Sequence, residues 1–243
     1  MFIPNGDDEN NTLAHNNGDG TFDLVTTGPV VTDGGNSTGS CWGDYDKDGD
    51  MDLFVANASD ENDFLYRNEG NGSFTRMANT PIVTSGGHSH GCSWVDVDND
   101  ADLDLYVSND NGTKFLFINS NGTFASKPTE IITANFGKTF GHSWSDYDKD
   151  GDMDVFAVTH SNQPNYFFTN NGNSNKWINI TLKGTNSNAS AIGAELSIRA
   201  NSEWQRMTVN AQNGIGGQNS LRQHFGLANA TMVDSILVKW PSG

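Results

Sequence analysis

The sequence predicts an all-β protein: a partial, open β-propeller of about three and a half four-stranded blades, followed by a small antiparallel β domain. Three observations lead to this fold class. An acidic nonapeptide begins at Asp44, Asp96 and Asp146, which are spacings of 52 and 50 residues. Each repeat holds four short segments suited to strands, and four strands in about 50 residues are typical of a propeller blade. The chain is also rich in Asn, Ser, Thr and Gly, which indicates many tight turns and little helix.

The first strand of each blade is predicted just before the acidic loop, where the pattern Gly-x-x-Trp recurs as Gly39–Trp42, Gly91–Trp94 and Gly141–Trp144. The tryptophans are expected to lie in the core between blades. The second strand follows the loop and is β-branched or aromatic, over residues 53–57, 105–108 and 155–159. Aromatic third strands are predicted at 64–66, 115–117 and 166–168. A Gly/Asn turn then leads to a fourth strand near Phe74 and near Phe124.

The acidic loops have the composition of calcium sites. Their sequence is Asp-Tyr-Asp-Lys-Asp-Gly-Asp-Met-Asp in the first and third repeats and Asp-Val-Asp-Asn-Asp-Ala-Asp-Leu-Asp in the second. Clustered carboxylates repel one another unless a cation neutralises them, and Ca²⁺ prefers a cage of six to eight oxygens. We therefore expect about three calcium ions, although solvated acidic turns without metal are the alternative. An EF-hand is excluded, because position 12 is Val or Ala and not Glu.

Side-chain oxygens are expected from positions 1, 3, 5 and 9 of each loop, and a backbone carbonyl from position 7. The predicted ligands are Asp44, Asp46, Asp48, Asp50 and Asp52; Asp96, Asp98, Asp100, Asp102 and Asp104; and Asp146, Asp148, Asp150, Asp152 and Asp154. Gly49 allows a sharp turn at position 6. The second loop has Ala101 there, so its site is expected to be strained or weaker.

The N-terminus carries part of one more repeat. Asn16–Phe22 matches the turn that begins at Asn68, so Met1 falls where an acidic loop should have just ended. The first blade is therefore predicted to lack its first strand and loop, and the repeats span approximately 1–35, 36–87, 88–137 and 138–175. We expect a fragment with further repeats before Met1. Its open blade edges would invite self-association.

Residues 176–243 are predicted to form the second domain. Apolar and polar residues alternate over Lys176–Leu182, Ala194–Arg199, Trp204–Val209 and Ser235–Trp240, as in antiparallel strands with one wet face. No long linker precedes them, so this domain is expected to pack against the last blade.

Charge and composition exclude several partners. The formal net charge of −17 and pI of about 4.4 argue against nucleic acid, whose backbone needs a basic surface, and against anionic membranes. No apolar run reaches the ~18 residues of a membrane-spanning helix, so no membrane insertion is expected. The start of the chain does not have the pattern of a signal peptide. Cys41 and Cys92 occupy adjacent positions of the aligned repeats; they are expected to point to opposite faces, to be buried and not to form a disulfide.

The repeats resemble the FG-GAP or VCBS repeats of integrin-α-like propellers. The motifs Ile192–Glu195, Gly214–Gly217, His224–Leu227 and Val238–Gly243 resemble the ASPIC/UnbV domain. Both together are similar to bacterial secreted proteins and to the cartilage acidic protein family. The resemblance implies calcium in the blade loops and an extracellular setting. It implies no established catalytic activity, and it indicates that the last domain is truncated at its C-terminus.

Two functions are compatible with these patterns. The first is a binding or adhesion module that holds a protein or glycan; the alternative is a secreted polysaccharide-acting enzyme or a non-catalytic part of one. The sequence shows no catalytic constellation, and no cofactor other than calcium is expected. His88 and His90 have the i, i+2 spacing that could begin a transition-metal site, but a surface role is the simpler interpretation.

Overall fold

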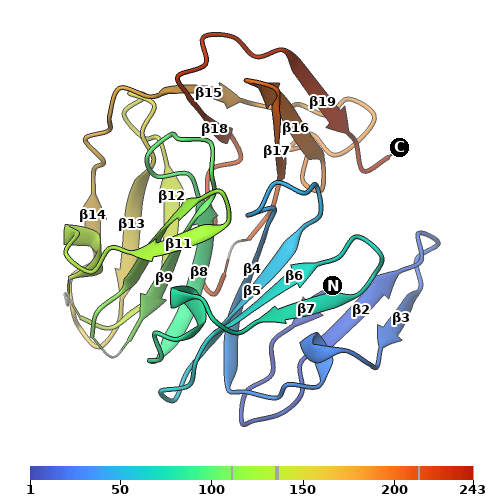
Figure 1. Cartoon of the computed structure of the whole chain (residues 1–243), viewed down its shortest axis with the longest axis vertical. Helices are drawn as coiled ribbons and strands as arrows, with labels where there is room; N and C mark the ends of the chain where they lie inside the picture. Colours follow the sequence, from blue (N-terminus) through green and yellow to red (C-terminus); the bar gives the residue numbers. More distant parts are fainter. Residues whose placement is uncertain (111, 135–136, 213, 243) are drawn as a thin grey trace.

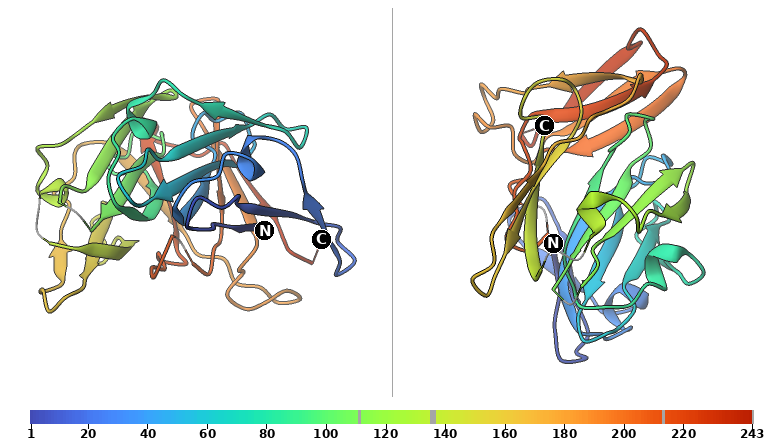
Figure 2. Two further views of the ribbon diagram at one scale, coloured as in Figure 1. Left: turned by 90° about the horizontal axis from the view of Figure 1, so that it is seen from below. Right: turned by 90° about the vertical axis from the view of Figure 1, so that its left-hand side faces the viewer.

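The structure is a computed structural model that describes residues 1–110, 112–134, 137–212 and 214–242. It consists almost entirely of antiparallel strands (Figure 1). Four sheets built from residues up to Phe168 are arranged side by side in chain order as blades, and the later residues form two smaller sheets at one end of them (Figures 1 and 2). Over the described residues no sheet closes into a ring, so the predicted open, partial propeller is confirmed.

The strands pair with their neighbours in sequence within each blade. The first sheet holds β1 (Phe2–Ile3), β2 (Thr12–Asn16) and β3 (Phe22–Val25); the second holds β4 (Ser37–Gly43), β5 (Asp52–Asn57), β6 (Phe64–Asn68) and β7 (Phe74–Met77); the third holds β8 (Ser89–Val95), β9 (Asp104–Asn109), β10 (Phe115–Ser120) and β11 (Thr123–Ser126); the fourth holds β12 (Thr139–Ser145), β13 (Asp154–Thr159) and β14 (Tyr166–Phe168). Short 3₁₀ turns at Pro29–Val31, Pro81–Val83 and Ile131–Thr133 lead from one blade to the next.

The blades differ in completeness. The second and third have the four predicted strands, and the first lacks its innermost strand as predicted. The fourth has three strands among its described residues, so the expectation of four strands in every complete period is wrong there. The chain after Phe168 is Thr-Asn-Asn-Gly-Asn-Ser-Asn, which has no aromatic residue to pack as a fourth strand. It leads instead to β15 of the next domain.

Aromatic side chains fill the spaces between blades, as the tryptophan pattern predicts. Trp94 stacks on Tyr45 with ring centroids 5.7 Å apart, and Trp144 meets Tyr106 edge to face at 5.5 Å. Both tryptophans are buried. Trp42 is only half-buried, because it packs towards the first sheet, which has no inner strand to cover it. These ring contacts join the second blade to the third and the third blade to the fourth.

The C-terminal domain consists of a two-stranded and a three-stranded sheet. β15 (Lys176–Ile180) pairs with β18 (Gln223–Ala228), and β16 (Glu195–Ala200) lies between β17 (Glu203–Thr208) and β19 (Ser235–Lys239). The sequence did not predict β18 as a strand. Its residues are buried almost without interruption, because one side packs in the domain core around Phe225 and the other touches the propeller. A strand covered on both faces shows no alternation.

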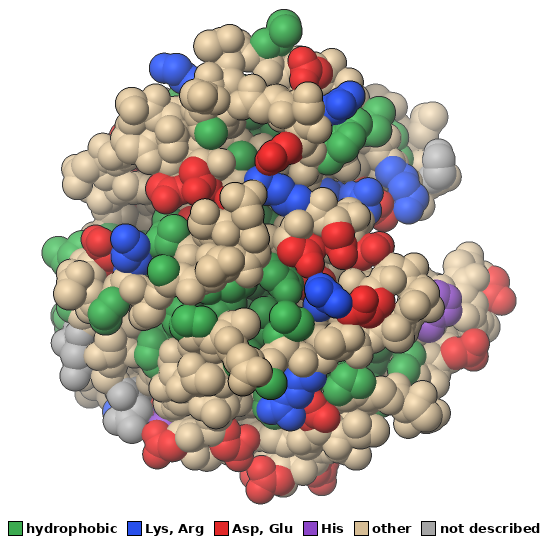
Figure 3. All heavy atoms as spheres, viewed as in Figure 1, with side chains coloured by type: hydrophobic (Ala, Val, Ile, Leu, Met, Phe, Trp, Pro, Cys, Tyr) green, Lys and Arg blue, Asp and Glu red, His purple; other side chains and the backbone are tan. Residues whose placement is uncertain are grey.

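This domain rests on three blades and not only on the last one. Arg206 and Glu203 reach the first acidic loop, His224 and Gly226 the second, and Trp177 the third. Acidic and basic side chains gather along this boundary in Figure 3. The expected packing against the last blade is therefore present, and the domain also contacts the acidic loops of the two blades before it.

The two cysteines are buried, as predicted, and both are free in the structure. They point to opposite faces of their strands, as expected, but this placement does not keep them apart. Cys41 points from the second blade towards the third, and Cys92 points from the third blade towards the second. Cys41 and Cys92 consequently share one core cluster.

Candidate metal centres

Each acidic loop joins the first and second strands of its blade, and three of its carboxylates converge. In each group the candidate ligand oxygens all lie within 4.8 Å of one another: Asp44, Asp46 and Asp48; Asp96, Asp98 and Asp104; Asp146, Asp148 and Asp154. Each group mixes nearly buried and partly exposed carboxylates. Such an arrangement offers several hard oxygen donors to one cation.

The aspartate at position 9 also accepts hydrogen bonds from backbone N–H groups, a role that its spacing in the sequence did not indicate. The Asn119 N–H donates to Asp104 Oδ1 at 2.8 Å and the Val97 N–H donates to Oδ2 at 2.9 Å. Asp52 and Asp154 accept the corresponding backbone N–H groups in their own blades. This residue therefore fastens the loop to the end of the third strand while its carboxylate lies beside the other acids.

The remaining predicted ligands lie outside these convergent groups. At position 5, Asp100 and Asp150 each accept a backbone N–H from within their own loop. At position 7, Asp102 forms an ion pair with Lys47 at 2.8 Å, and Asp152 Oδ1 accepts the Asn99 amide at 2.8 Å. The side chains at position 7 thus bind neighbouring loops, and a ligand role for the backbone carbonyls there remains a prediction.

Burial makes these carboxylates poor anions without a cation. Asp96 is only 2% exposed, and desolvation, aided by the charges of Asp100 and Asp98, raises its pKa to about 8. Desolvation likewise raises the pKa of Asp52 to about 8 and that of Asp44 to about 6. A bound divalent cation would favour the ionised forms and release the protons they hold.

The carboxylates predict a pH dependence for the calcium-depleted protein. The folded pKa values of Asp44, Asp52 and Asp96 lie above the ordinary value of 3.8, so between about pH 4 and 8 the folded state binds more protons than the unfolded state. Stability should therefore fall as the pH rises through this window, and saturating calcium should remove the loss. Urea midpoints at pH 5 and pH 8 measure it; equal midpoints in the depleted protein would contradict the electrostatic argument.

The chemistry of the donor set fits calcium. Asp98 Oδ1 and Asp146 Oδ1 are buried and have no hydrogen-bond partner among the described residues. A buried carboxylate oxygen without a donor is costly, and a hard cation satisfies it. The residues present thus fit a calcium ion in each loop.

Two positions of each loop adopt left-handed backbone. Position 6 has φ of 98° at Gly49 and 94° at Gly151, but it is Ala101, with φ of 80°, in the second loop. The predicted strain of the second loop is therefore confirmed, whereas its affinity is untested. Position 4 is also left-handed and holds Lys or Asn, which the sequence did not reveal; Asn tolerates this conformation well.

Replacement of Ala101 by Gly should stabilise the protein, because glycine adopts positive φ without a steric penalty. The expected gain is about 0.5–1 kcal/mol in the free energy of unfolding. Denaturant melts of A101G and the wild type measure it. Gly151→Ala is the opposite change in the third loop and should destabilise by more, since its Cβ would also overlap Trp177. A neutral or destabilising A101G would remove the strain argument.

Asn99, at position 4 of the second loop, connects two loops and the C-terminal domain. Its amide donates to the Gly151 carbonyl at 3.0 Å and to Asp152, and its oxygen lies 2.6 Å from His224 Nε2. The other ring nitrogen of His224 lies 3.1 Å from the Asn179 oxygen. This network is buried, so it fixes the domain on the second and third loops together.

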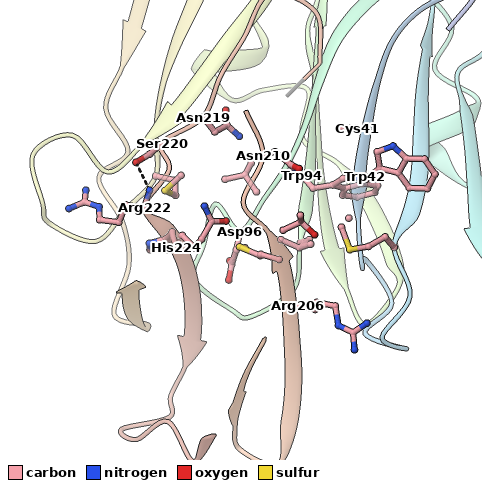
Figure 4. Close-up of a pocket in the computed structure, with 18 residues that line it drawn as sticks. Cys41, Trp42, Trp94, Asp96, Arg206, Asn210, Asn219, Ser220, Arg222 and His224 are labelled. Atoms are coloured by element: carbon pink, nitrogen blue, oxygen red, sulfur yellow. Dashed lines mark hydrogen bonds between the residues drawn. The ribbon is translucent and has the colours of Figure 1, made fainter. Parts of the chain in front are cut away.

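A small cavity of about 90 Å³ lies where the C-terminal domain meets the blades. Figure 4 shows Trp42 and Trp94 on one side of it and His224 and Arg222, from the C-terminal domain, on the other, with Asp96 between them. The cavity is too small for a sugar or peptide, but it brings the second metal loop next to the domain boundary.

The histidines are placed as packing and surface residues. His88 and His90 both approach Asp110, at 3.5 and 3.6 Å, and His90 stacks on Phe140. They do not belong to any convergent metal-ligand group found among the described residues. His142 is buried on β12 against Ser93, and desolvation lowers its pKa to about 3.

Comparison with known families agrees with this architecture. Residues 2–55, 44–107 and 96–157 match the model of the FG-GAP-like repeat, and residues 184–243 match that of ASPIC and UnbV. A comparison with curated proteins gives no match. Among the described residues no helix is both long and apolar enough to cross a membrane.

Proposed function

The chain belongs to the FG-GAP-like repeat family, and from this premise we propose that it is a calcium-binding extracellular repeat protein that serves as a binding or adhesion module for a protein or a glycan. The observation that carries the calcium assignment is the convergence of three aspartates, at least one of them buried, in each of three equivalent loops. In each loop the residues at positions 1 and 3 hold the ion, joined by position 5 in the first loop and position 9 in the other two.

In this proposal, calcium neutralises the carboxylates of the acidic loops. The loops that it would order are the same loops on which the C-terminal domain rests. Arg206 donates to the Gly49 carbonyl of the first loop, and the Ala228 N–H donates to the Asn99 carbonyl of the second at 2.8 Å. An ion in each loop thus helps to hold a rigid platform of blades and domain.

A groove between the third and fourth blades supports the role as a binding module. This groove has a volume of about 320 Å³, and its apolar lining includes Ile132, Val155 and Phe168. Trp144 lines it, is 1% exposed, and has an indole N–H without a hydrogen-bond partner among the described residues. Apolar walls with a few polar groups are usual in ligand sites, and a sugar ring offers the matching apolar face and hydroxyl acceptors.

The experiment that tests this function is a glycan panel, screened once for binding and once for product release, with and without calcium. Calcium-dependent binding without product supports the module. Released product would favour the alternative, a secreted polysaccharide-acting enzyme or a non-catalytic part of one. Retention at the groove should weaken in Trp144→Phe, which keeps a six-membered aromatic ring but removes the indole N–H.

We also propose that copies of the chain associate through the open ends of the blade array. Phe156 and Val158 on β13 are exposed, whereas the equivalent Phe54 and Ala56 are buried by the next blade. An uncovered sheet face or edge favours association. Light scattering should show oligomers that diminish when Phe156 and Val158 are both changed to Ser. A stable monomer at high concentration would contradict this expectation.

A further inference from the structure

The inner strands of the second and third blades lie side by side with a fixed offset. Thr38 Oγ1 on β4 donates to the Ser89 carbonyl on β8 at 2.7 Å, a separation of 51 residues. A Cβ at Gly39 would overlap the carbonyl of His90, which has the same offset. The two strands are therefore in close contact along the boundary between blades.

The same offset places Cys41 opposite Cys92. Gly43 continues the alignment, because a Cβ there would overlap the ring of Trp94. Cys41 lies midway between Gly39 and Gly43 on one strand, and Cys92 midway between His90 and Trp94 on the other. Alternation along each strand puts both thiols on the faces that meet.

Burial and contact agree with this placement. The cysteines are 4% and 0% exposed and belong to one core cluster. Burial raises the pKa of the Cys92 thiol, and a hydrogen bond with the Cys41 thiol raises it further. Both thiols are thus held at close range within the core.

The next boundary shows that the repeat brings these two positions into contact. Cys41 directly precedes its tryptophan, and Cys92 lies two residues before its own. The equivalent pair between the third and fourth blades is Ser93 and His142, and their side chains lie 2.9 Å apart. Direct contact between these positions is therefore a property of neighbouring blades and not an accident of one pair.

We propose that Cys41 and Cys92 are a modification site, at which a disulfide forms between the second and third blades under oxidising conditions. The oxidant is a small disulfide such as oxidised glutathione. One cysteine thiolate attacks it and releases one glutathione thiolate. The second cysteine thiolate then attacks the protein sulfur of the mixed disulfide and releases the other. Two protein thiols are oxidised, one oxidised glutathione is reduced to two glutathione thiols, and these take up the two protons.

The test is refolding of the reduced, unfolded chain in a glutathione redox buffer, which gives the buried thiols access to the oxidant. Intact mass should fall by about 2 Da, the loss of two hydrogens, and non-reducing peptide maps should join the peptides of Cys41 and Cys92. The melting temperature should rise on the order of 5–10 °C over the reduced protein. Two free thiols, or a stable glutathione adduct on one of them, would overturn the proposal.

Matched variants separate this geometry from chance oxidation. Ser40→Cys combined with Cys41→Ser moves the thiol one residue along β4 to the other face, and it should not link to Cys92. In a background with Cys41→Ser and Cys92→Ser, the pair Ser93→Cys and His142→Cys should form the equivalent link between the next two blades. A link of wild-type yield in the Ser40→Cys variant would show that the strand faces do not control the bond, and would overturn the proposal.

Discussion

Removal of calcium is expected to lower the melting temperature and to loosen the C-terminal domain from the blades. A ligand that binds only the folded state stabilises it by RT ln(1 + [L]/Kd). With millimolar calcium and Kd values of about 10⁻⁴–10⁻³ M, each site adds on the order of 1 kcal/mol. Three sites would then shift the melting temperature by roughly 6–12 °C for a chain of this size.

The shift should be larger at low salt, because repulsion among the freed carboxylates is less screened. Calorimetric melts in excess chelator and after calcium is restored measure it. Proteolysis after removal of calcium should cut the connection at residues 169–175 first, since the loops that hold the domain are no longer neutralised. A melting curve that chelator leaves unchanged would count against structural calcium.

Replacement of Gly226 by Val is expected to separate the C-terminal domain from the second metal loop. A Cβ at Gly226 would lie 2.0 Å from Asp96 Oδ2 and 2.6 Å from the backbone of Asn99. The backbone cannot rotate away as a flexible side chain can. Overpacking of this kind costs about 1–3 kcal/mol, and here the domain can avoid the cost by moving off the loop.

The separation should appear as a second transition in thermal melts and as faster proteolysis between the domains. Gly20→Ala is the control, because the space around Gly20 is open and only its left-handed φ of 92° opposes a side chain. That change should cost about 1 kcal/mol and leave a single transition. If G226V melted and was cleaved like Gly20→Ala, the close contact between β18 and the second loop would not hold the domain in place.

The repeats could be predicted because the residues that define each strand and loop lie close together in the sequence. The Gly-x-x-Trp strand, the acidic loop and the β-branched strand after it fix the order of strands within a blade, and the alignment of Asn16–Phe22 with the turn at Asn68 reveals the incomplete first blade. The convergence of the acidic side chains follows from their spacing within one loop.

The contacts between distant segments were not predictable. Asn99 gave no sign of its bond to His224, 125 residues away, and β18 lacks alternation because the propeller covers its second face. Cys41 and Cys92 were correctly placed on opposite faces of their strands, but this placement does not separate them. Two neighbouring blades pack with opposite faces together. The pattern of a single strand does not reveal this packing.

Calcium titration by isothermal calorimetry tests the central claim most directly. We expect about three ions per chain, and one fewer in Asp98→Asn, which removes a charge from the second convergent group. Asp234→Asn, at an exposed carboxylate outside the loops, should bind as the wild type does. A stoichiometry below two in the wild-type protein would contradict the assignment of the acidic loops as calcium sites.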